Sequence, residues 1–349
     1  MKLTRESKWM EGSGPYADIV ISSRIRLARN FEELPFPHLL SEAQQKKVVD
    51  KLQEVVSSPV VQQKVGRLEL IILNELTPLQ RQILVEKHLI SPELAAAGGY
   101  KGVVLREDDA VSIMINEEDH LRIQSFLPAL QLVEAWRLAS FVDDVLEGML
   151  KYAFSEEYGY LTSCPTNVGT GLRASVMMHL PALVLTDQAR RVLSALPRVG
   201  LVVRGLYGEG TEAVGNLFQI SNQLTLGQTE EEIITNLSSV TKHIIDQEKK
   251  AREKIMKEDR GKLEDQVYRA YGILTSARVI SSQEALTLLS KVRLGIDLKI
   301  IKNIDPRKFV ELLVKIQPAY LQVLTGREMD YAERDWKRAA VLRETLGVK

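Results

Sequence analysis

The sequence predicts an α+β protein in which helices pack on an antiparallel or mixed sheet and an all-helical region follows. Strand and helix signals alternate over roughly the first 250 residues, whereas the last 90 or so contain no convincing strand. The chain has 349 residues, which exceeds the usual length of one domain. We therefore place a boundary near residue 255 and predict two domains, over residues 1–255 and 256–349.

The first domain begins with mixed elements. A capping box at residues 41–44 begins a helix that extends to residue 56, and the apolar run 68–76 is typical of a buried strand. Residues 102–106 and 111–116 predict two strands about a turn, and a helical pattern covers residues 121–154. Strands are also expected over 201–204 and 217–226, the second in a hairpin that turns at Ser221-Asn222.

Helix signals dominate after Gly227. A second capping box at Thr229 begins a helical tract that extends to about residue 277. Within it, residues 246–260 are nearly all charged or small, which is typical of a solvated helix or a linker. Further helices start at Ser281 and at Asp305-Pro306, the latter ending at Gly326, and a last helix covers residues 330–346.

Charge and cysteine content limit the class of protein. Lysine plus arginine and aspartate plus glutamate both total 46, so the formal net charge is zero. Binding nucleic acid or a membrane surface through overall charge requires a basic excess, so we expect neither partner. Cys164 has no second cysteine to pair with, the N-terminus lacks a signal-peptide pattern, and no apolar stretch is long enough to span a membrane. We expect a cytoplasmic protein.

An arginine pair follows an apolar run near the N-terminus, in Ser22-Ser23-Arg24-Ile25-Arg26. Arg24 and Arg26 are two positions apart, so on a strand both side chains point to the same face. Two guanidinium groups on one face suit a polyphosphate, because each binds oxygens bidentately and neither loses its charge. The alternative is a solvated strand face.

An acidic cluster, Glu117-Glu118-Asp119-His120, stands where a strand ends and, on our interpretation, a helix begins. Arg122 lies four residues after Glu118 and would share its face on a helix. The cluster indicates either helix N-terminal residues in solvent or a carboxylate that binds a cation or accepts a proton. The ligand spacing of a zinc site is absent, and we expect no metal held by the protein alone.

Two loops are rich in turn-forming residues. Cys164-Pro165-Thr166-Asn167 begins the first, which lacks the ending of a P-loop; Cys164 is either a small buried residue or part of a site. Arg173 follows shortly after. The second loop, Arg204-Gly205-Leu206-Tyr207-Gly208-Glu209, is either a hinged loop that brings Glu209 over a ligand or a plain surface hairpin.

Five arginines thus lie at element ends or beside flexible loops: Arg24, Arg26, Arg122, Arg173 and Arg204. With the loop carboxylates Glu118 and Glu209 they suit an anion bound next to a cation. Spacing alone therefore predicts an enzyme that handles phosphate.

Five motifs in this order resemble the catalytic domain of the phosphagen (guanidino) kinases, the family of creatine and arginine kinases. They are Ser22-Ser23-Arg24-Ile25-Arg26, Asn116-Glu117-Glu118-Asp119-His120-Leu121-Arg122, Cys164-Pro165-Thr166-Asn167, Arg173-Ala174-Ser175-Val176 and Arg204-Gly205-Leu206-Tyr207-Gly208-Glu209. The resemblance covers residues 15–255 and implies an antiparallel sheet flanked by helices.

The resemblance implies ATP as a cofactor, with Mg²⁺ carried on the nucleotide. The residues it assigns to the ATP site are Ser22, Ser23, Arg24, Ile25, Arg26, His88, Arg122, Arg173, Ala174, Ser175, Val176, Met177, Arg204, Gly205, Leu206, Tyr207 and Gly208. For His88 a satisfied surface histidine is the alternative. The resemblance also implies that Glu118 and Glu209 hold the substrate guanidinium beside Cys164. We expect Glu118 to be the base, because a guanidinium must lose a proton as it attacks.

The order of the domains departs from the kinases of small guanidino compounds. Only 21 residues precede Ser22, too few for the helical domain that those kinases have there, and the helical region follows instead. This organisation resembles the bacterial protein arginine kinases, which phosphorylate arginine side chains and mark proteins for Clp-type proteolysis in stress response and protein quality control. The alternatives are a kinase of free arginine and a phosphoarginine-binding adaptor for a protease.

The segment Arg334-Asp335-Trp336-Lys337-Arg338-Ala339 resembles the phosphoarginine-binding motif of those kinases. Arg334 and Arg338 share a helix face, so the resemblance implies an allosteric product site formed by Arg334, Asp335, Arg338 and Ala339; the alternative is an exposed helix with ordinary surface pairs. It also implies protein substrates with exposed arginines and, as partners, a zinc-containing activator, the heat-shock repressor and a Clp unfoldase and protease. Leucine-rich C-terminal helices lead us to expect a homo-oligomer.

Overall fold

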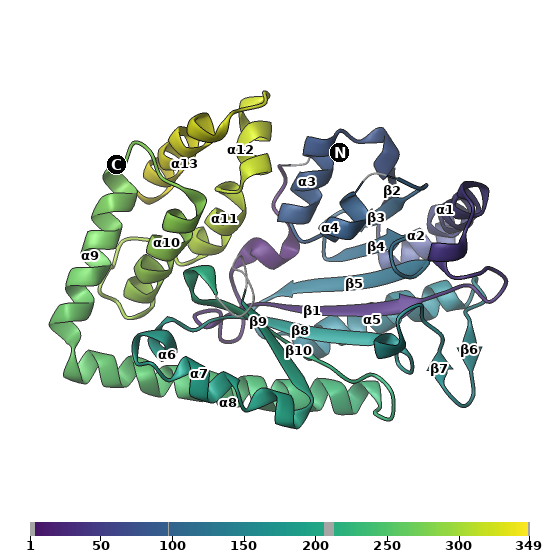
Figure 1. Ribbon diagram of the computed structural model, residues 1–349, viewed down its shortest axis with the longest axis horizontal. Coiled ribbons are helices and arrows are strands. Elements are labelled where there is room, and N and C mark those ends of the chain that lie inside the picture. The colour runs from purple at the N-terminus through teal and green to yellow at the C-terminus, as the bar shows by residue number, and fades with distance from the viewer. Residues whose placement is uncertain (1–3, 97, 206–212, 348–349) are drawn as a thin grey trace.

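A computed structural model describes residues 4–96, 98–205 and 213–347. Its centre is an eight-stranded sheet in the order β2-β3-β4-β5-β1-β8-β10-β9, in which all neighbours are antiparallel (Figure 1). The strands are β1 Val20–Arg29, β2 Leu68–Ile72, β3 Gly102–Arg106, β4 Val111–Ile115, β5 Leu121–Pro128, β8 Leu172–His179, β9 Leu201–Gly205 and β10 Leu217–Asn222. A separate hairpin pairs β6 (Phe154–Ser155) with β7 (Gly159–Tyr160). The predicted antiparallel sheet with flanking helices is confirmed.

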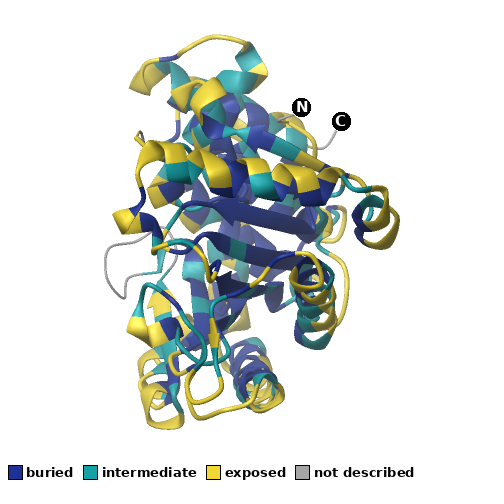
Figure 2. Cartoon of the chain, turned by 90° about the vertical axis from the view of Figure 1, so that its right-hand side faces the viewer, coloured by how far each residue is buried: buried dark blue, intermediate teal, exposed yellow. Residues whose placement is uncertain are grey.

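Helices cover the two faces of this sheet unequally. The helices α1 (Glu42–Ser57), α2 (Pro59–Val65), α5 (Leu132–Glu147) and α8 (Glu230–Glu258) share one large apolar core with the sheet. On the other face, α3 (Pro78–Glu86) and α4 (Pro92–Ala95) cover only the end formed by β2, β3 and β4, through a smaller cluster. The strands are buried between helices whose outer surfaces are exposed (Figure 2). On this face α3 and α4 do not cover the strands that follow in the sheet, β5, β1, β8, β10 and β9.

The C-terminal part is helical, as predicted: beyond β10 the described residues form only helices and loops. Its helices are α9 (Arg260–Ser276), α10 (Ser282–Asp297), α11 (Arg307–Lys315), α12 (Pro318–Thr325) and α13 (Tyr331–Leu346); the short α6 (Pro181–Leu185) and α7 (Ala189–Leu193) precede α8. This region packs back on the sheet domain, α12 against α3 and α11 against the 3₁₀ helix Lys8–Glu11. None of the described helices combines the length and apolar character needed to cross a membrane.

The prediction of one helix over residues 121–154 is wrong at both ends, since α5 ends at Glu147 and Phe154 lies in β6. Residues Leu121–Pro128 form strand β5, and the helix begins only at Leu132. Periodicity alone cannot distinguish a helix from a strand in a short apolar run. Here the residues form a strand because they pair with both β1 and β4. Consequently Asn116-Glu117-Glu118-Asp119-His120 is a tight turn between two strands rather than the start of a helix, and Asn116 adopts a φ of 58°.

Other boundaries also differ. Ser221 and Asn222 lie inside β10, paired with β9, and do not form a turn. The strand predicted over residues 68–76 ends at Ile72 and continues as a 3₁₀ helix. The charged segment 246–260 lies mostly in α8 and is not simply solvated, because Glu248 and Arg252 are buried in an ion pair. Pro318 divides the helix predicted up to Gly326 into α11 and α12.

Candidate functional site

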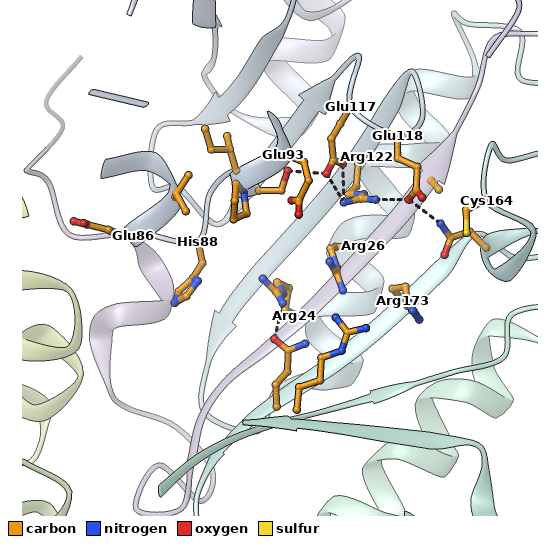
Figure 3. Close-up of a pocket in the computed structure, with 18 of the residues that line it drawn as sticks. Arg24, Arg26, Glu86, His88, Glu93, Glu117, Glu118, Arg122, Cys164 and Arg173 are labelled. Atoms are coloured by element: carbon orange, nitrogen blue, oxygen red, sulfur yellow. Dashed lines mark hydrogen bonds and ion pairs between the residues drawn. The ribbon is translucent and has the colours of Figure 1, made fainter. Parts of the chain in front are cut away.

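A cleft of about 1290 Å³ opens on the less covered face of the sheet (Figure 3). All five of the predicted arginines line it: Arg24, Arg26, Arg122, Arg173 and Arg204. Glu118, Cys164, His88 and Gly205 line the same cleft. The structure therefore brings together residues that are far apart in the sequence: Arg24 and Gly205, for example, are separated by 181 positions.

The strand register explains why the arginines meet. Arg24 and Arg26 alternate with Ile25 on β1, so both side chains leave the apolar face. Arg26 is paired with Arg173 on β8, and Arg122 on β5 is paired with Ala28 on the other side of β1. Like charges directly opposite each other destabilise a sheet. The arrangement therefore suits an anion in the cleft, which would offset this repulsion.

The electrostatics of the arginines point the same way. Burial, followed by the charge of Arg122, lowers the pKa of Arg24 to about 10. Burial and three neighbouring arginines lower the pKa of Arg26 well below its usual value, and no residue in the described part of the chain forms a hydrogen bond with its buried Nε. Burial and Arg204 lower the pKa of Arg173. The cleft therefore has a concentrated positive charge and, within the described residues, a buried donor without a partner on one of the arginines that line it.

Glu118 lies at the opposite end of the cleft from His88, with Arg24 and Arg26 between them (Figure 3). Its Oε2 accepts a hydrogen bond from Arg122 Nη2 at 2.9 Å and one from Asn167 Nδ2 at 3.4 Å. Arg122 also forms an ion pair with the buried Glu117. The Glu118 side chain remains 42% exposed, so its carboxylate is oriented but accessible to a ligand.

Asp119 fixes this turn relative to the cysteine loop. Its Oδ1 accepts hydrogen bonds from Asn30 Nδ2 at 2.7 Å and from the Ser163 backbone N–H at 2.8 Å. The half-buried Cys164 follows, with Sγ 3.0 Å from Thr166 Oγ1. A single carboxylate thus joins the end of β1, the turn containing Glu118 and the loop containing Cys164.

His120 is structural in this fold. It is fully buried; its Nδ1 accepts from the Phe31 backbone N–H at 3.0 Å, which leaves Nε2–H to donate to the Pro35 carbonyl at 2.9 Å. Among the described residues, no group of three or more histidine, cysteine or acidic side chains is placed to hold a metal ion.

His88 borders the end of the cleft that is remote from Glu118. It has a φ of 58° and lies against Trp9 and Phe126, with ring centroids 5.6 and 6.2 Å away. Burial, and then the charge of Arg24, lowers its pKa to about 3. The imidazole is therefore neutral at physiological pH.

We expect the His88 Cε1–H resonance to stay at its neutral chemical shift from about pH 8 down to about pH 5, although an unfolded histidine titrates near 6.5. Because the folded chain excludes this proton, the stability that His88 contributes is lost as the pH falls below about 6.5 towards 3. The measurement is an NMR titration assigned with His88→Gln, with the urea-unfolded chain as control. An inflection between about pH 6 and 7 for His88 in the folded chain contradicts the assignment.

The other residues expected at the nucleotide, and Glu209 expected at the guanidinium, differ in their positions. The side chains of Ser23, Ile25, Ala174 and Val176 are buried on the helix-covered side of the sheet, and Ser22 and Met177 are buried without lining the cleft. Ser175 faces the cleft side, where its Oγ accepts from Arg24 Nε at 3.5 Å. Leu206, Tyr207, Gly208 and Glu209 lie outside the described residues.

The cleft also contains residues that the sequence did not single out. Gln219 accepts a hydrogen bond from Arg24 Nη2 at 2.8 Å. Gln219 carries no sequence signal, because its place depends on the pairing of β10 with β8 and β9. Gln82 and Glu86 from α3, with Gln317 and Pro318 from the start of α12, line the end near His88.

The C-terminal motif lies on α13, where Arg334 and Arg338 are one turn apart. Arg338 is 2% exposed; it donates to the Ile316 carbonyl at 2.9 Å and the Ile280 carbonyl at 3.0 Å, and forms an ion pair with Asp335. Arg334 donates to the Met329 carbonyl at 3.1 Å and is half-buried. Ala339 is buried. In this structure the motif's charged groups hold the C-terminal helices together.

Comparison with known proteins identifies the family. The family model of the ATP:guanido phosphotransferase C-terminal catalytic domain matches residues 47–251. The chain belongs to the ATP:guanido phosphotransferase family. A second model, the protein-arginine kinase McsB C-terminal domain, matches residues 260–349.

Full-length relatives narrow this assignment. The chain is 64% identical over 346 residues to the protein-arginine kinase of Moorella thermoacetica, which covers 99% of both chains. It is 52% identical over 340 residues to that of Bacillus subtilis, covering 97% of this chain and 93% of the relative. Among solved structures, lombricine kinase superposes with a TM-score of 0.57 at 26% identity over 68% of each chain. Within the family, the chain thus groups with the protein-arginine kinases.

Proposed function

We propose that the chain transfers the γ-phosphoryl group of ATP to arginine side chains of proteins. The names of its full-length relatives support the reaction and the acceptor. The observation in the structure that best supports it is the cleft itself, in which five guanidinium groups converge beside the accessible carboxylate of Glu118. Such a cleft suits a polyanion in the centre and a cationic acceptor at one end.

The arginines bind and neutralise the phosphates of ATP. The buried Nε of Arg26 has no hydrogen-bond partner among the described residues, which fits a phosphate oxygen. Because this donor and its neighbours select an anion, we propose that Mg²⁺ reaches the cleft on the nucleotide rather than in a protein cage. When bound, Mg²⁺ neutralises part of the charge on the phosphates.

The acceptor arginine binds at the Glu118 end. One of its nitrogens attacks the γ-phosphorus, the N–H proton passes to the Glu118 carboxylate, and the bond between the γ-phosphorus and the bridging oxygen breaks to release ADP. Arg122 and Asn167 hold the carboxylate in place for this transfer. We propose that Glu209 binds the other side of the guanidinium and that Cys164 lies beside it; the motif resemblance supports both roles.

The acceptor is tested by competition. Incubation with Mg-ATP and an unfolded, arginine-rich protein should yield protein-bound phosphoarginine, detected by mass spectrometry, and excess free arginine should leave its rate unchanged. Complete competition, with phosphorylation of free arginine, would instead indicate a kinase of small guanidino compounds. Phosphoarginine binding without any transfer would indicate an adaptor.

We propose that α13 also binds phosphoarginine, through Arg334, Asp335, Arg338 and Ala339, because two guanidinium groups suit a phosphate and a carboxylate suits the attached guanidinium. Arg334→Ala is expected to weaken the binding of free phosphoarginine by about tenfold or more, as loss of a charge-assisted hydrogen bond does. Isothermal titration calorimetry measures this, with Arg327→Ala on the exposed loop before α13 as a matched control. Unchanged affinity in a folded Arg334→Ala would refute the site.

We further propose that the phosphorylated proteins pass to a Clp unfoldase and protease in the cytoplasm. A zinc-containing activator and the heat-shock repressor are the other partners we propose. The resemblance of the motifs to the bacterial protein arginine kinases supports these partners, and the leucine-rich C-terminal helices support a homo-oligomer.

A further inference from the structure

The cleft continues beyond His88 and reaches the C-terminal helices. There it is lined by Gln82 and Glu86 of α3 and by Gln317 and Pro318 at the start of α12. The arginines that line the same cleft come from strands of the sheet domain. One wall of this end is therefore supplied by a part of the chain that follows the sheet by 95 positions, from Asn222 to Gln317.

Glu86 holds this wall in place. Its two carboxylate oxygens accept hydrogen bonds from the backbone N–H groups of Ala319 and Tyr320, each at 2.8 Å. These are first-turn donors of α12, which have no partner within their own helix. A carboxylate at a helix N-terminus is also favoured by the helix dipole. Glu86 thus caps α12 from the sheet domain.

The segment after Glu86 is anchored to the sheet domain. Lys87 Nζ lies 2.7 Å from the buried carboxylate of Asp109, and the Lys87 carbonyl accepts from Trp9 Nε1 at 3.1 Å. His88 then packs against Trp9 and Phe126. Because Glu86 is fixed on this side, its two hydrogen bonds determine where the start of α12 lies relative to the cleft.

On the other side, the start of α12 is tied to α13. Arg338 Nε donates to the carbonyl of Ile316, one residue before Gln317, at 2.9 Å. Burial raises the pKa of Glu86 to about 7, while the two backbone N–H groups and the charges of Arg338 and Arg334 lower it. The positive charges of Arg334 and Arg338 on α13 therefore act on the same carboxylate that caps α12.

The order of groups along the cleft indicates what meets this wall. Glu118 and Cys164 lie at one end, the arginines in the middle, and His88 and Glu86 at the other end (Figure 3). If the phosphates lie on the arginines and the acceptor at Glu118, the nucleoside extends towards His88. It then approaches the wall formed by Gln317 and Pro318.

We infer that the start of α12 forms part of the nucleoside site and that Glu86 is the positioning residue that holds it there. This inference rests on the proposed nucleotide site, and it assigns nucleotide affinity, but not the chemical step, to a contact with the C-terminal helices. Loss of the Glu86 carboxylate then weakens nucleotide binding and leaves the arginines and Glu118 in place.

Direct binding of Mg-ADP tests this. Glu86→Ala and Glu86→Gln are expected to raise the Kd for Mg-ADP about fivefold or more, the lower end of usual coupling between sites. The KM for ATP should rise by the same factor, while kcat at saturating ATP changes by less than about twofold, as for a group outside the chemical step. Glu75→Gln, the same change of charge at an exposed residue, is the control. Unchanged Kd in folded variants, or a lower kcat with unchanged KM, overturns the inference.

A second measurement needs no variant. Coupling is reciprocal, so bound Mg-ADP should slow hydrogen exchange at the amides of Ala319 and Tyr320 in the unmodified chain. Exchange that Mg-ADP leaves unchanged at both amides contradicts the inference. Both experiments measure binding without an acceptor; a chain that binds Mg-ADP in this manner but transfers no phosphate would refute the proposed function and leave the role of Glu86 standing.

Discussion

Replacing Glu118 with glutamine is expected to lower the rate of phosphoryl transfer by about 10³-fold, within the range that general bases contribute. Glutamine keeps the size of the side chain but can neither accept the proton of the attacking guanidinium nor attract its charge. On the proposal that the five arginines lining the cleft bind the phosphates, the Kd for Mg-ATP should change by no more than about threefold. Initial rates of phosphoarginine formation and calorimetric binding of Mg-ATP measure the two effects.

The matched control is Glu75→Gln, which makes the same chemical change at an exposed site outside the cleft. A rate within about fivefold of the unmodified chain would remove Glu118 as the base. A lost affinity for Mg-ATP would have a different meaning. The 2.9 Å hydrogen bond from Arg122 to Glu118 would then be needed to position Arg122 for the phosphates, and the roles of Glu118 in nucleotide binding and in proton transfer would not be separable.

Arg26→Met is expected to affect activity and stability in opposite directions. Arg26 faces Arg173 across β1 and β8, and burial together with three arginines lowers its pKa. An uncharged side chain of similar length removes this repulsion, so without nucleotide the free energy of unfolding should rise by about 1 kcal/mol. Transfer should fall by at least about 10³-fold, as on loss of other arginines that stabilise a transferring phosphoryl group.

Initial rates of phosphoarginine formation measure the loss of transfer, and thermal unfolding with and without Mg-ATP measures stability and nucleotide binding. The Tm of Arg26→Met should exceed that of the unmodified chain without nucleotide, and the rise in Tm on adding Mg-ATP should be smaller, since stabilisation by a ligand follows its affinity. Arg67→Met, at an exposed arginine outside the cleft, is the control. A lower Tm for folded Arg26→Met would show that Arg26 stabilises the fold, and would contradict the proposal that it is held in the cleft to bind an anion at a cost in stability.

Local sequence patterns predicted the central part of this site. The two-residue spacing of Arg24 and Arg26 is sufficient to place both on one face, because strand side chains alternate strictly. The capping boxes at Ser41 and Thr229 likewise begin α1 and α8 where expected, because the reciprocal hydrogen bonds involve only four consecutive residues.

Features that depend on distant parts of the chain were not predictable. Residues 121–128 read as helix because their strand character comes from pairing with β1 and β4. The position of Gln219 beside Arg24 depends on how three strands align, and the capping of α12 by Glu86 joins residues 233 and 234 positions apart. The family was recognised because five motifs follow one another in order, whereas any single motif was ambiguous.

The acceptor atom that we propose is an arginine nitrogen of a protein. The most direct measurement labels an unfolded, arginine-rich protein with γ-labelled Mg-ATP and compares how much label survives mild acid and mild alkali. Label on the protein that is lost in acid and retained in alkali is the result we expect, because a phosphoryl group on nitrogen is acid-labile. Label that survives acid would place the phosphoryl group on a hydroxyl and contradict the account.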